Sequence, residues 1–311
     1  MTHDTHTNPV EHAQFLLSKG RSADALTLVR NADPDDTPAR RVLARTLMAL
    51  GRHDEAAPIL KTLLDADPSD GFARQHLAAI ERSLEGPPPI EGERSYHTSI
   101  PREFLLGIQN ALHRFSYAGL PMLKNPFDLA IYAKLVHDVR PGLILELGSK
   151  TGASALWFAH QCDSFGLRTK IVSVDVVGVT EVSHDRVTYL EGDARKLDEV
   201  LPARGFDDAA LHRFPKPWIV IDDADHAYRT SQAIAEWCEP RLVPGDYLVV
   251  EDGIISDLVP EAHPGCTSGP HRAIREVLDT DPPAYEIDAT YCDMFGVNVT
   301  WCTNGFLRRI R

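Results

Sequence analysis

Residues 143–152 read LILELGSKTG, and this stretch decides the fold of the larger part of the chain. The first five residues predict a buried strand, and Gly148 and Gly152 permit a tight turn with close approach of the backbone to a ligand. The helix-forming residues Ala153 to Ala159 follow directly. The turn reads Gly-x-x-x-Gly after an acid, Glu146, rather than the Gly-x-Gly-x-x-Gly of dinucleotide binders. This spacing argues against an NAD site.

Strand and helix patterns alternate around this stretch. A helix is expected at Phe127 to Val139, before the first strand, and further apolar runs rich in β-branched and aromatic residues recur about every 15 to 30 residues after it. These runs are Ile171 to Val174, Val187 to Leu190, Trp218 to Ile221 and Tyr247 to Val250. The pattern predicts right-handed βαβ crossovers and a parallel sheet covered by helices on both faces.

Acidic residues follow the next two strands of this predicted sheet. Asp175 ends the second strand, where a carboxylate can accept hydrogen bonds from ribose hydroxyls, and Asp193 ends the third, near the expected position of an adenine amine. A single acid at a strand end is as likely to cap the following helix as to contact a ligand. Acids at four consecutive strand ends indicate a ligand site along the carboxyl edge of the sheet.

The other two strand ends carry acidic patches. Asp222-Asp223-Ala224-Asp225-His226 follows the fourth strand and Glu251-Asp252 follows the fifth. Neighbouring parallel strands lie roughly 4.8 Å apart, so acids beyond both ends can share one hard cation. Carboxylates without cysteine favour magnesium, manganese or calcium over zinc. The alternative is a pair of ordinary acidic loops.

The first 85 residues predict helical hairpins in two similar copies. Apolar residues recur at helical spacing in four segments separated by Gly or Pro: Ala13 to Leu17, Ala23 to Val29, Ala39 to Leu50 and Glu55 to Leu64. The tripeptide Ala32-Asp33-Pro34 returns as Ala66-Asp67-Pro68, 34 residues later, whereas the corresponding glycines, Gly20 and Gly51, are 31 apart. The segment from about residue 9 to 85 resembles the tetratricopeptide repeat. Dimerisation or docking of a partner is the favoured role, and a plain helical cap is the alternative.

Proline marks the boundary between the two parts of the chain. Gly86-Pro87-Pro88-Pro89 cannot continue a helix. We therefore predict a helical domain at 1–85, a linker and cap helix at 86–124 with Pro101 to Phe115 helical, and a catalytic domain at 125–311. The long loop from Ile255 to Pro270, before a helix at His271 to Leu278, is expected to act as a lid over the site or as plain surface.

Composition excludes several classes of partner. A formal net charge of −13 argues against a nucleic-acid partner, because binding a phosphate backbone needs a clustered basic surface. No apolar stretch approaches the ~20 residues that span a bilayer, and the start of the chain is polar, so a soluble cytoplasmic protein is expected. Five widely spaced cysteines with no Cys-x-x-Cys pair predict reduced, packed thiols.

The ordered motifs resemble a known family. Glu146-x-Gly148-x-x-x-Gly152, Asp175 and Asp193 together look like the pattern of class I S-adenosylmethionine-dependent methyltransferases, which have a Rossmann-like α/β sheet. Further motifs resemble the cephalosporin hydroxylase and rhamnosyl O-methyltransferase family: Asn125-Pro126-Phe127-Asp128-Leu129, Glu146-Leu147-Gly148-Ser149, Asp223-Ala224-Asp225-His226, Val250-Glu251-Asp252-Gly253 and Gly269-Pro270. This likeness runs from about residue 120 to 311 and implies a closing antiparallel hairpin at Tyr285 to Tyr291 and Gly305 to Ile310.

The resemblance implies cofactors and roles. S-adenosylmethionine would lie against six residues: Glu146, Gly148, Ser149, Gly152, Asp175 and Asp193. A divalent metal, expected to be magnesium, would bind Asp223, Glu251 and Asp252. Related catechol-type enzymes place a basic lysine three residues beyond the first metal ligand. Here that position is His226, which is therefore the expected base, and a helix-start histidine that merely packs is the alternative.

The expected reaction is transfer of a methyl group from S-adenosylmethionine to a hydroxyl of a small, oxygen-rich acceptor. The sulfonium is already an activated donor, so the enzyme must deprotonate the acceptor and align it. A metal that chelates two oxygens favours a vicinal diol, catechol or hydroxy-carbonyl, such as a glycoside or an intermediate of natural-product or antibiotic biosynthesis. Two alternatives stay open, namely a non-enzymatic adaptor that acts through its repeats and a hydroxylation-associated family member. The sequence does not choose between Asp222 and Asp223 beyond the resemblance, and it leaves the acceptor and the oligomeric state open.

Overall fold

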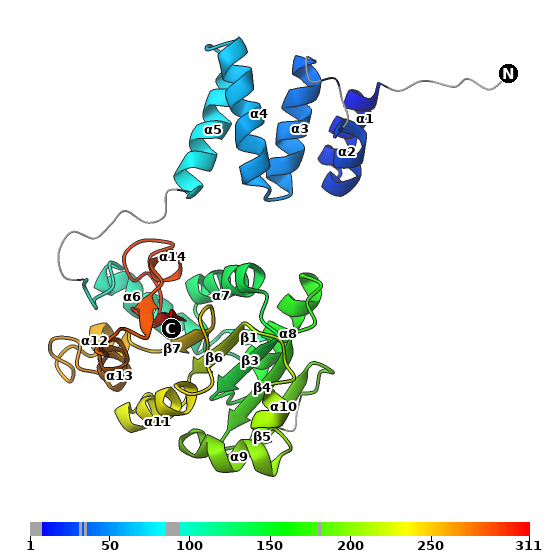
Figure 1. Ribbon diagram of the computed structural model, residues 1–311. Helices are drawn as coiled ribbons and strands as arrows, with labels where there is room; N and C mark the ends of the chain where they lie inside the picture. The colour runs from blue at the N-terminus through cyan, green and yellow to red at the C-terminus, as the bar shows by residue number, and fades with distance from the viewer. Residues whose placement is uncertain (1–7, 31–32, 34–35, 85–93, 180–181) are drawn as a thin grey trace. The chain divides into compact units, whose positions relative to one another are not determined.

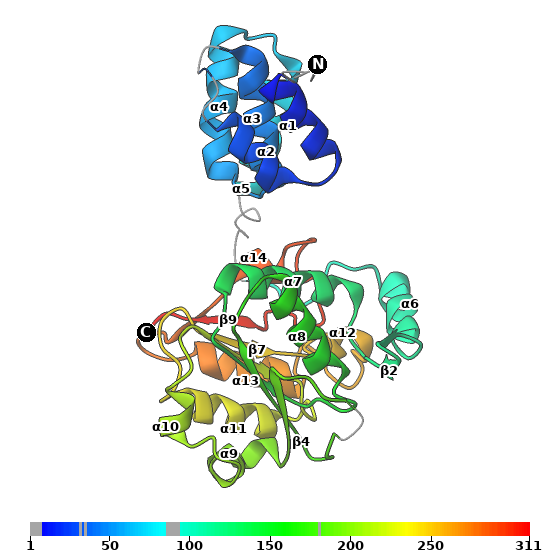
Figure 2. The same cartoon turned by 90° about the vertical axis from the view of Figure 1, so that its right-hand side faces the viewer.

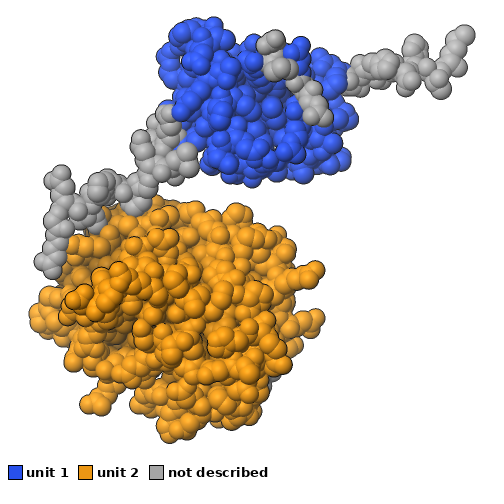
Figure 3. All heavy atoms as spheres, in the orientation of Figure 1, with its two compact units in different colours: residues 1–88 blue, residues 89–311 orange. Residues whose placement is uncertain are grey.

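The computed structural model describes residues 8–30, 33, 36–84, 94–179 and 182–311. The chain forms two compact units, residues 1–88 and 89–311, which are coloured separately in Figure 3. The start of the predicted linker, 86–93, the polar start of the chain, 1–7, and both Ala32 and Pro34 of the repeated tripeptide lie outside the described residues.

The smaller unit is built from helices that pack against their neighbours in the chain. They are α1 (Pro9–Ser18), α2 (Ser22–Val29), α3 (Thr37–Ala49), α4 (His53–Ala66) and α5 (Gly71–Leu84). The side chains of Asn8 and Asp36 cap α1 and α3 by accepting backbone hydrogen bonds, as helix-starting residues do. Leu47, Leu60 and Leu63 are buried between α3, α4 and α5. The predicted helical hairpins are confirmed.

The fifth helix had no counterpart among the four predicted segments. It begins at Gly71, directly after Asp70, whose carboxylate accepts hydrogen bonds from the backbone of Ala73 and from the guanidinium of Arg41 at 2.7 Å. Asp70 is thus a helix-start signal, with its charge neutralised by an arginine from α3.

The larger unit contains a mixed sheet in the order β5-β4-β3-β6-β7-β9-β8. Five strands are parallel, namely β3 (Leu143–Leu147), β4 (Lys170–Asp175), β5 (Val187–Glu191), β6 (Trp218–Asp222) and β7 (Tyr247–Val250). The antiparallel pair β8 (Tyr285–Ile287) and β9 (Phe306–Arg309) closes the sheet beside β7. All five predicted parallel strands and the closing hairpin are confirmed (Figure 1).

Helices cover both faces of this sheet, as Figures 1 and 2 show. Successive strand residues point to opposite faces, so Ile144 joins one apolar cluster and Leu145 the other. The first cluster packs under α7 (Pro126–Val139) and α8 (Ala153–Ser164), and the second under α9 (Leu197–Ala203), α11 (Tyr228–Cys238) and α13 (Gly269–Leu278). The structure thereby confirms the predicted α/β fold with helices on both faces.

The segments between the main elements differ from the prediction in detail. The expected helix at Pro101 to Phe115 is α6 (Arg102–Leu112), and a short hairpin, β1 (Ser116–Tyr117) with β2 (Leu120–Pro121), follows it. The supposed lid loop contains the short helix α12 (Ile255–Leu258), packed against α6, so part of it is ordered structure. The smaller remaining helices are η1 (Ala194–Lys196), α10 (Asp208–Leu211) and α14 (Ala289–Cys292).

The five cysteines are free and buried, as predicted. Within the described ranges, every helix is too short or too polar to cross a membrane.

Candidate active site

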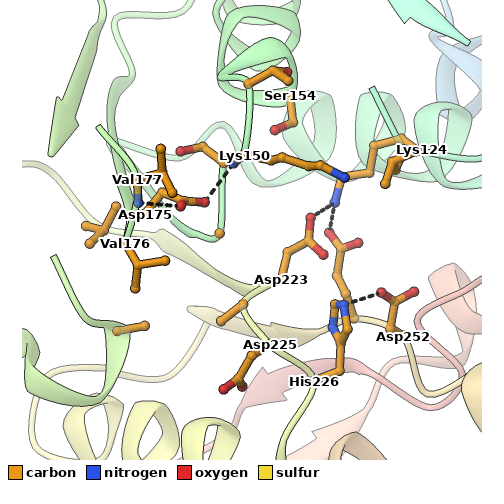
Figure 4. Close-up of a pocket in the computed structure, with 18 of the residues that line it drawn as sticks. Lys124, Lys150, Ser154, Asp175, Val176, Val177, Asp223, Asp225, His226 and Asp252 are labelled. Carbon is orange, nitrogen blue, oxygen red and sulfur yellow. Dashed lines mark hydrogen bonds and ion pairs between the residues drawn. The ribbon is translucent and has the colours of Figure 1, made fainter. Parts of the chain in front are cut away.

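A cavity of about 580 Å³ opens at the carboxyl ends of the parallel strands, where the sequence predicts the ligand site. Its walls come from the segment before α7, the loops after β3, β4 and β5, and the two acidic patches after β6 and β7. Figure 4 shows part of this lining. The loops therefore bring most of the predicted cofactor and metal residues to one cavity.

The loop after β3 forms a cradle of backbone. Gly148 has φ of +102°, and a Cβ atom there would lie 1.9 Å from the carbonyl oxygen of Asp223, so only glycine fits. Gly152 has φ of +79°, and a Cβ atom there would lie 2.7 Å from Val179. The tight turn expected at these glycines is present, and it contacts the strand end that carries Asp223.

Two polar side chains of the same motif are buried beside this turn. Glu146 is fully buried and accepts a hydrogen bond of 2.6 Å from the hydroxyl of Ser173, and burial raises its pKa to about 7. The hydroxyl of Ser149 is buried, lines the cavity and has no hydrogen-bond partner among the described residues. Buried polar groups normally have partners, so Ser149 marks a place for a polar ligand.

The acids after β4 and β5 also line the cavity, and both contact backbone. Asp175 accepts hydrogen bonds from the backbone of Lys150 at 2.7 Å and Val177 at 2.9 Å. Asp193 caps η1 through the backbone of Arg195 and pairs with its guanidinium at 2.7 Å. A carboxylate has about four acceptor sites, so the two contacts of Asp175 leave room for ligand hydrogen bonds, whereas Asp193 already accepts four hydrogen bonds from Arg195. Asp193 thus fulfils the helix-capping alternative while still facing the cavity.

The acidic patches after β6 and β7 meet around a buried lysine. The ammonium of Lys124 lies 2.7 Å from Oδ2 of Asp223 and also contacts Oε1 of Glu251 (Figure 4). The hydroxyl of Tyr132 donates a second hydrogen bond of 2.6 Å to the same Oε1. Asp222, in contrast, is the last residue of β6, buried and absent from the cavity wall. Of the two adjacent aspartates, Asp223 is the one that faces the cavity.

His226 and Asp252 contact each other directly at the cavity wall. Nε2 of His226 lies 3.1 Å from Oδ2 of Asp252 (Figure 4). Both residues have left-handed backbone, with φ of +56° and +58°, which is uncommon for residues other than glycine and clusters at functional sites. The structure thereby holds a histidine and a carboxylate in place at the cost of local strain.

Three of these side chains lie close enough together to bind one metal ion. Among the described residues, one potential ligand atom from each of Asp223, His226 and Asp252 lies within 4.8 Å of the other two. The structure therefore brings Asp223 and Asp252 together as predicted and adds His226. Glu251 lies beside them, bound to Lys124 and Tyr132.

The electrostatics of this cluster follow from burial and close charges. Burial raises the pKa of Asp223, Glu251 and Asp252, while Lys124 and His226 oppose that shift. Burial alone would lower the pKa of Lys124, but Asp223 and Glu251 outweigh it and raise that pKa above the ordinary lysine value. The ammonium is therefore charged, and the cluster carries more acidic than basic groups.

Lys124 and Tyr132 were not predicted from the sequence. Lys124 immediately precedes Asn125, which caps α7, and Tyr132 lies on that helix. The Asn-Pro-Phe-Asp motif also carries Asp128, which is buried and accepts hydrogen bonds from Thr300 and from the backbone of Trp301, a cavity residue. The motif thus positions two parts of the cavity wall. The signal available in the sequence was a lysine placed directly before a capped helix start.

Comparison with known proteins assigns both units. A family model described as Rhamnosyl O-methyltransferase/CmcI matches residues 109–310, and a Tetratricopeptide repeat model matches residues 16–80. The Rhamnosyl O-methyltransferase of Mycobacterium leprae (strain TN) is 32% identical over 205 residues, covering 62% of this chain and 82% of that protein. The protein of the same name from Mycobacterium tuberculosis (strain ATCC 25618 / H37Rv) is 31% identical over 203 residues, covering 62% of this chain and 78% of its own length.

Solved structures resemble the chain at lower similarity. "CmcI-N160 apo-structure" is 23% identical with a TM-score of 0.49, and "cmcI-D160 Mg-SAM" is 23% identical with a TM-score of 0.47. Each covers 75% of this chain and 95% of its own. The assignment rests on the sequence matches, which confirm the expected S-adenosylmethionine-dependent O-methyltransferase class and the helical-repeat region. Since the family model spans most of the larger unit and more than half of the chain, the chain belongs to the Rhamnosyl O-methyltransferase/CmcI family.

Proposed function

We propose that this protein transfers a methyl group from S-adenosylmethionine to one hydroxyl of a small acceptor with neighbouring oxygens, with a divalent metal bound at the acidic patches. The observation that carries the proposal is the single cavity in which the glycine turn after β3 meets the acids after β6 and β7. A donor site and an acceptor site in one cavity are what in-line transfer requires. The relatives named rhamnosyl O-methyltransferases favour a glycoside as acceptor.

The cofactor would lie against the loops that follow β3, β4 and β5. Gly148 and Ser149 would face the methionine part, and the unpartnered hydroxyl of Ser149 would gain a hydrogen bond there. Glu146 and Gly152, the other two residues expected to contact the cofactor, do not line the cavity and would support the turn from behind. Asp175 would accept hydrogen bonds from the ribose hydroxyls, and Asp193 would lie near the adenine. Val176, 68% exposed and lining the cavity, offers an apolar surface for the adenine ring.

The metal would bind Asp223, Glu251 and Asp252, a set of hard oxygen ligands suited to magnesium. Lys124 and Tyr132 both contact Oε1 of Glu251, so Oε2 would be the atom available to a metal. A divalent cation held by these residues would lower the pKa of an acceptor hydroxyl and favour a neighbouring oxygen as a second ligand. That chemistry favours a vicinal diol.

His226 would act as the general base. Asp252 orients its ring at 3.1 Å, and the left-handed backbone fixes its direction. In the transfer step the acceptor oxygen forms a bond to the methyl carbon as the carbon–sulfur bond breaks. The hydroxyl proton passes to His226, and S-adenosylhomocysteine leaves with the electron pair of the broken bond on sulfur.

No specific feature of the cavity supports either alternative, the hydroxylation-associated family member or the non-enzymatic adaptor. The ligand group found among the described residues has one histidine and two carboxylates, whereas a non-haem iron oxygenase site has two histidines and one carboxylate. An adaptor without turnover does not require the strained His226 and Asp252 pair.

Methyl transfer to matched sugars tests the proposal. The full chain is mixed with S-adenosylmethionine and either methyl rhamnoside or its monodeoxy analogues, and S-adenosylhomocysteine formation is followed with magnesium or with EDTA. We expect turnover on the vicinal diol, at least tenfold less on analogues that lack the neighbouring hydroxyl, and loss in EDTA that magnesium restores. Full turnover in EDTA would remove the metal from the mechanism. Absence of both turnover and cofactor binding would favour the adaptor.

A further inference from the structure

Lys124 is a buried cation inside the acidic cluster. Its side chain is 5% exposed, and its ammonium contacts Asp223 on one side and Glu251 on the other. Both contacts are carboxylates that the proposed function assigns to the metal. A lysine buried to this extent is rare unless it is paired, and here both partners belong to the same site.

The position of this ammonium is fixed by its neighbours. Lys124 directly precedes Asn125, whose side chain accepts hydrogen bonds from the backbone of Phe127 and Asp128 and so anchors the start of α7. The ring of Tyr132, about two helix turns further along the chain, lies 5.7 Å from the ammonium, and its hydroxyl donates to the same oxygen of Glu251. A cation fixed in this way cannot swing freely to solvent when another cation arrives.

We propose that Lys124 is a resident counter-cation that neutralises the acidic cluster when no metal is bound and weakens the binding of the divalent metal. This inference rests on the metal site of the proposed function and adds a positioning residue to it. The ammonium attracts the carboxylates of Asp223 and Glu251 in the metal-free protein, so the ligands stay oriented at the cavity. It also repels a second cation held by the same carboxylates.

The two possible roles of Lys124 predict opposite changes in metal affinity when the lysine is removed. If Lys124 only supported the fold of the cavity, its removal would disorder Asp223 and Glu251 and weaken metal binding. If it acts as a counter-cation, its removal leaves one more uncompensated negative charge on the pair Asp223 and Glu251, and metal binding tightens. The sign of the change in metal affinity therefore separates the two roles.

Titration with Mn²⁺, followed by the electron paramagnetic resonance signal of the free ion, shows whether metal binding tightens or weakens. The measurement needs no acceptor and no turnover. The full chain is compared with Lys124→Met, Lys124→Arg and the control Lys216→Met. Lys216 is a partly buried lysine that pairs with Asp246 and does not line the cavity. We expect Lys124→Met to bind Mn²⁺ at least tenfold more tightly, and both other variants to bind within about threefold of the wild type.

Thermal unfolding in EDTA and in Mn²⁺ supplies a second readout. Lys124→Met should unfold at a lower temperature than the wild type in EDTA and show the larger rise on addition of Mn²⁺. Lys124→Gln serves if the methionine variant does not fold, and folding of either variant only in the presence of Mn²⁺ would also support the counter-cation. Failure of both to fold even with Mn²⁺ would overturn it.

The outcomes separate this inference from the proposed function. Unchanged or weaker Mn²⁺ binding by Lys124→Met, beside clear binding by the wild type, overturns the role of the lysine and leaves the metal site standing. Absence of Mn²⁺ binding by the wild type overturns the metal site itself.

Discussion

His226 is the residue on which the proposed chemistry depends most. Replacing it with alanine removes the base but leaves Asp223, Glu251 and the glycine turn in place. Because positioned general bases contribute ~10² to 10⁴-fold, kcat should fall by that factor while the affinity for S-adenosylmethionine stays within about threefold.

A rate assay across pH with a calorimetric control on cofactor affinity checks this prediction. His212→Ala is the matched control, since that histidine is exposed and lies outside the cavity wall. Full activity of His226→Ala at every pH would show that the histidine only packs against Asp252.

His271 gives the protein a predictable acid sensitivity. It is fully buried between the hydroxyls of Ser256 and Thr303, and burial lowers its pKa to about 3, with Arg275 adding to the effect. In the unfolded chain a histidine binds a proton near pH ~6.5, so below that pH the unfolded state gains a proton that the folded state does not. The free energy of unfolding should therefore fall by about 1.4 kcal/mol per pH unit from that group.

Urea unfolding at pH 7 and pH 5 measures this effect. Between these values the wild type should lose ~2 kcal/mol more stability than His271→Gln, whatever the cost of the substitution at pH 7. Equal losses of unfolding free energy in both proteins would show that His271 does not control the fall in stability at acidic pH.

At the residue scale, the sequence predicted which acids reach the cavity better than what they contact there. Asp175, Asp193, Asp223 and Asp252 all line it, because strand ends and loop starts follow from hydrophobic pattern. Lys124 was missed since it lies 99 residues from Asp223, and no local pattern brings the two together. Asp223 could be preferred to Asp222 only through its offset from His226.

The glycine turn after β3 is the element that joins the two halves of the cavity. Gly148→Ala would place a methyl group 1.9 Å from the carbonyl oxygen of Asp223, where backbone must move. We expect this substitution to weaken S-adenosylmethionine binding at least tenfold. Gly205→Ala is the control, because Gly205 also has positive φ, +82°, but open space at its Cβ.

Calorimetric titration of both glycine variants with S-adenosylmethionine tests the role of the turn. Gly205→Ala should retain wild-type affinity while losing roughly 1 kcal/mol of stability, the cost of left-handed backbone. Similar cofactor affinity in both variants would mean that the close approach at Gly148 does not shape the site.

Long apolar runs at the element scale predicted the sheet well. All five parallel strands begin and end within one residue of their expected positions, since buried strands have a strong, continuous apolar signal. Short elements were not predicted. The strands β1 and β2 span two residues each and α12 spans four, which is too few for a periodic pattern. The closing hairpin came only from the resemblance, and the place of β9 between β7 and β8 was not predicted, because pairing order is a tertiary property.

The larger unit should function without the helical repeats. It has its own apolar clusters on both sheet faces, and it retains Arg94, whose guanidinium pairs with Asp293 at 2.8 Å. A chain of residues 89–311 is therefore expected to fold cooperatively and to bind S-adenosylmethionine within about twofold of the full chain. Circular dichroism and calorimetry check both points, and a loss of cofactor affinity beyond tenfold would assign the repeats a part in the site.

The central claim is that one cavity holds S-adenosylmethionine and, separately, a metal on the acidic patches. Calorimetry of the wild type and of Asp223→Asn, titrated first with S-adenosylmethionine and then with magnesium, tests it most directly. We predict that both proteins bind the cofactor with affinities within about threefold, and that the heat of magnesium binding disappears in the variant. Cofactor binding absent from the wild type, or magnesium binding that Asp223→Asn leaves unchanged, would contradict the account.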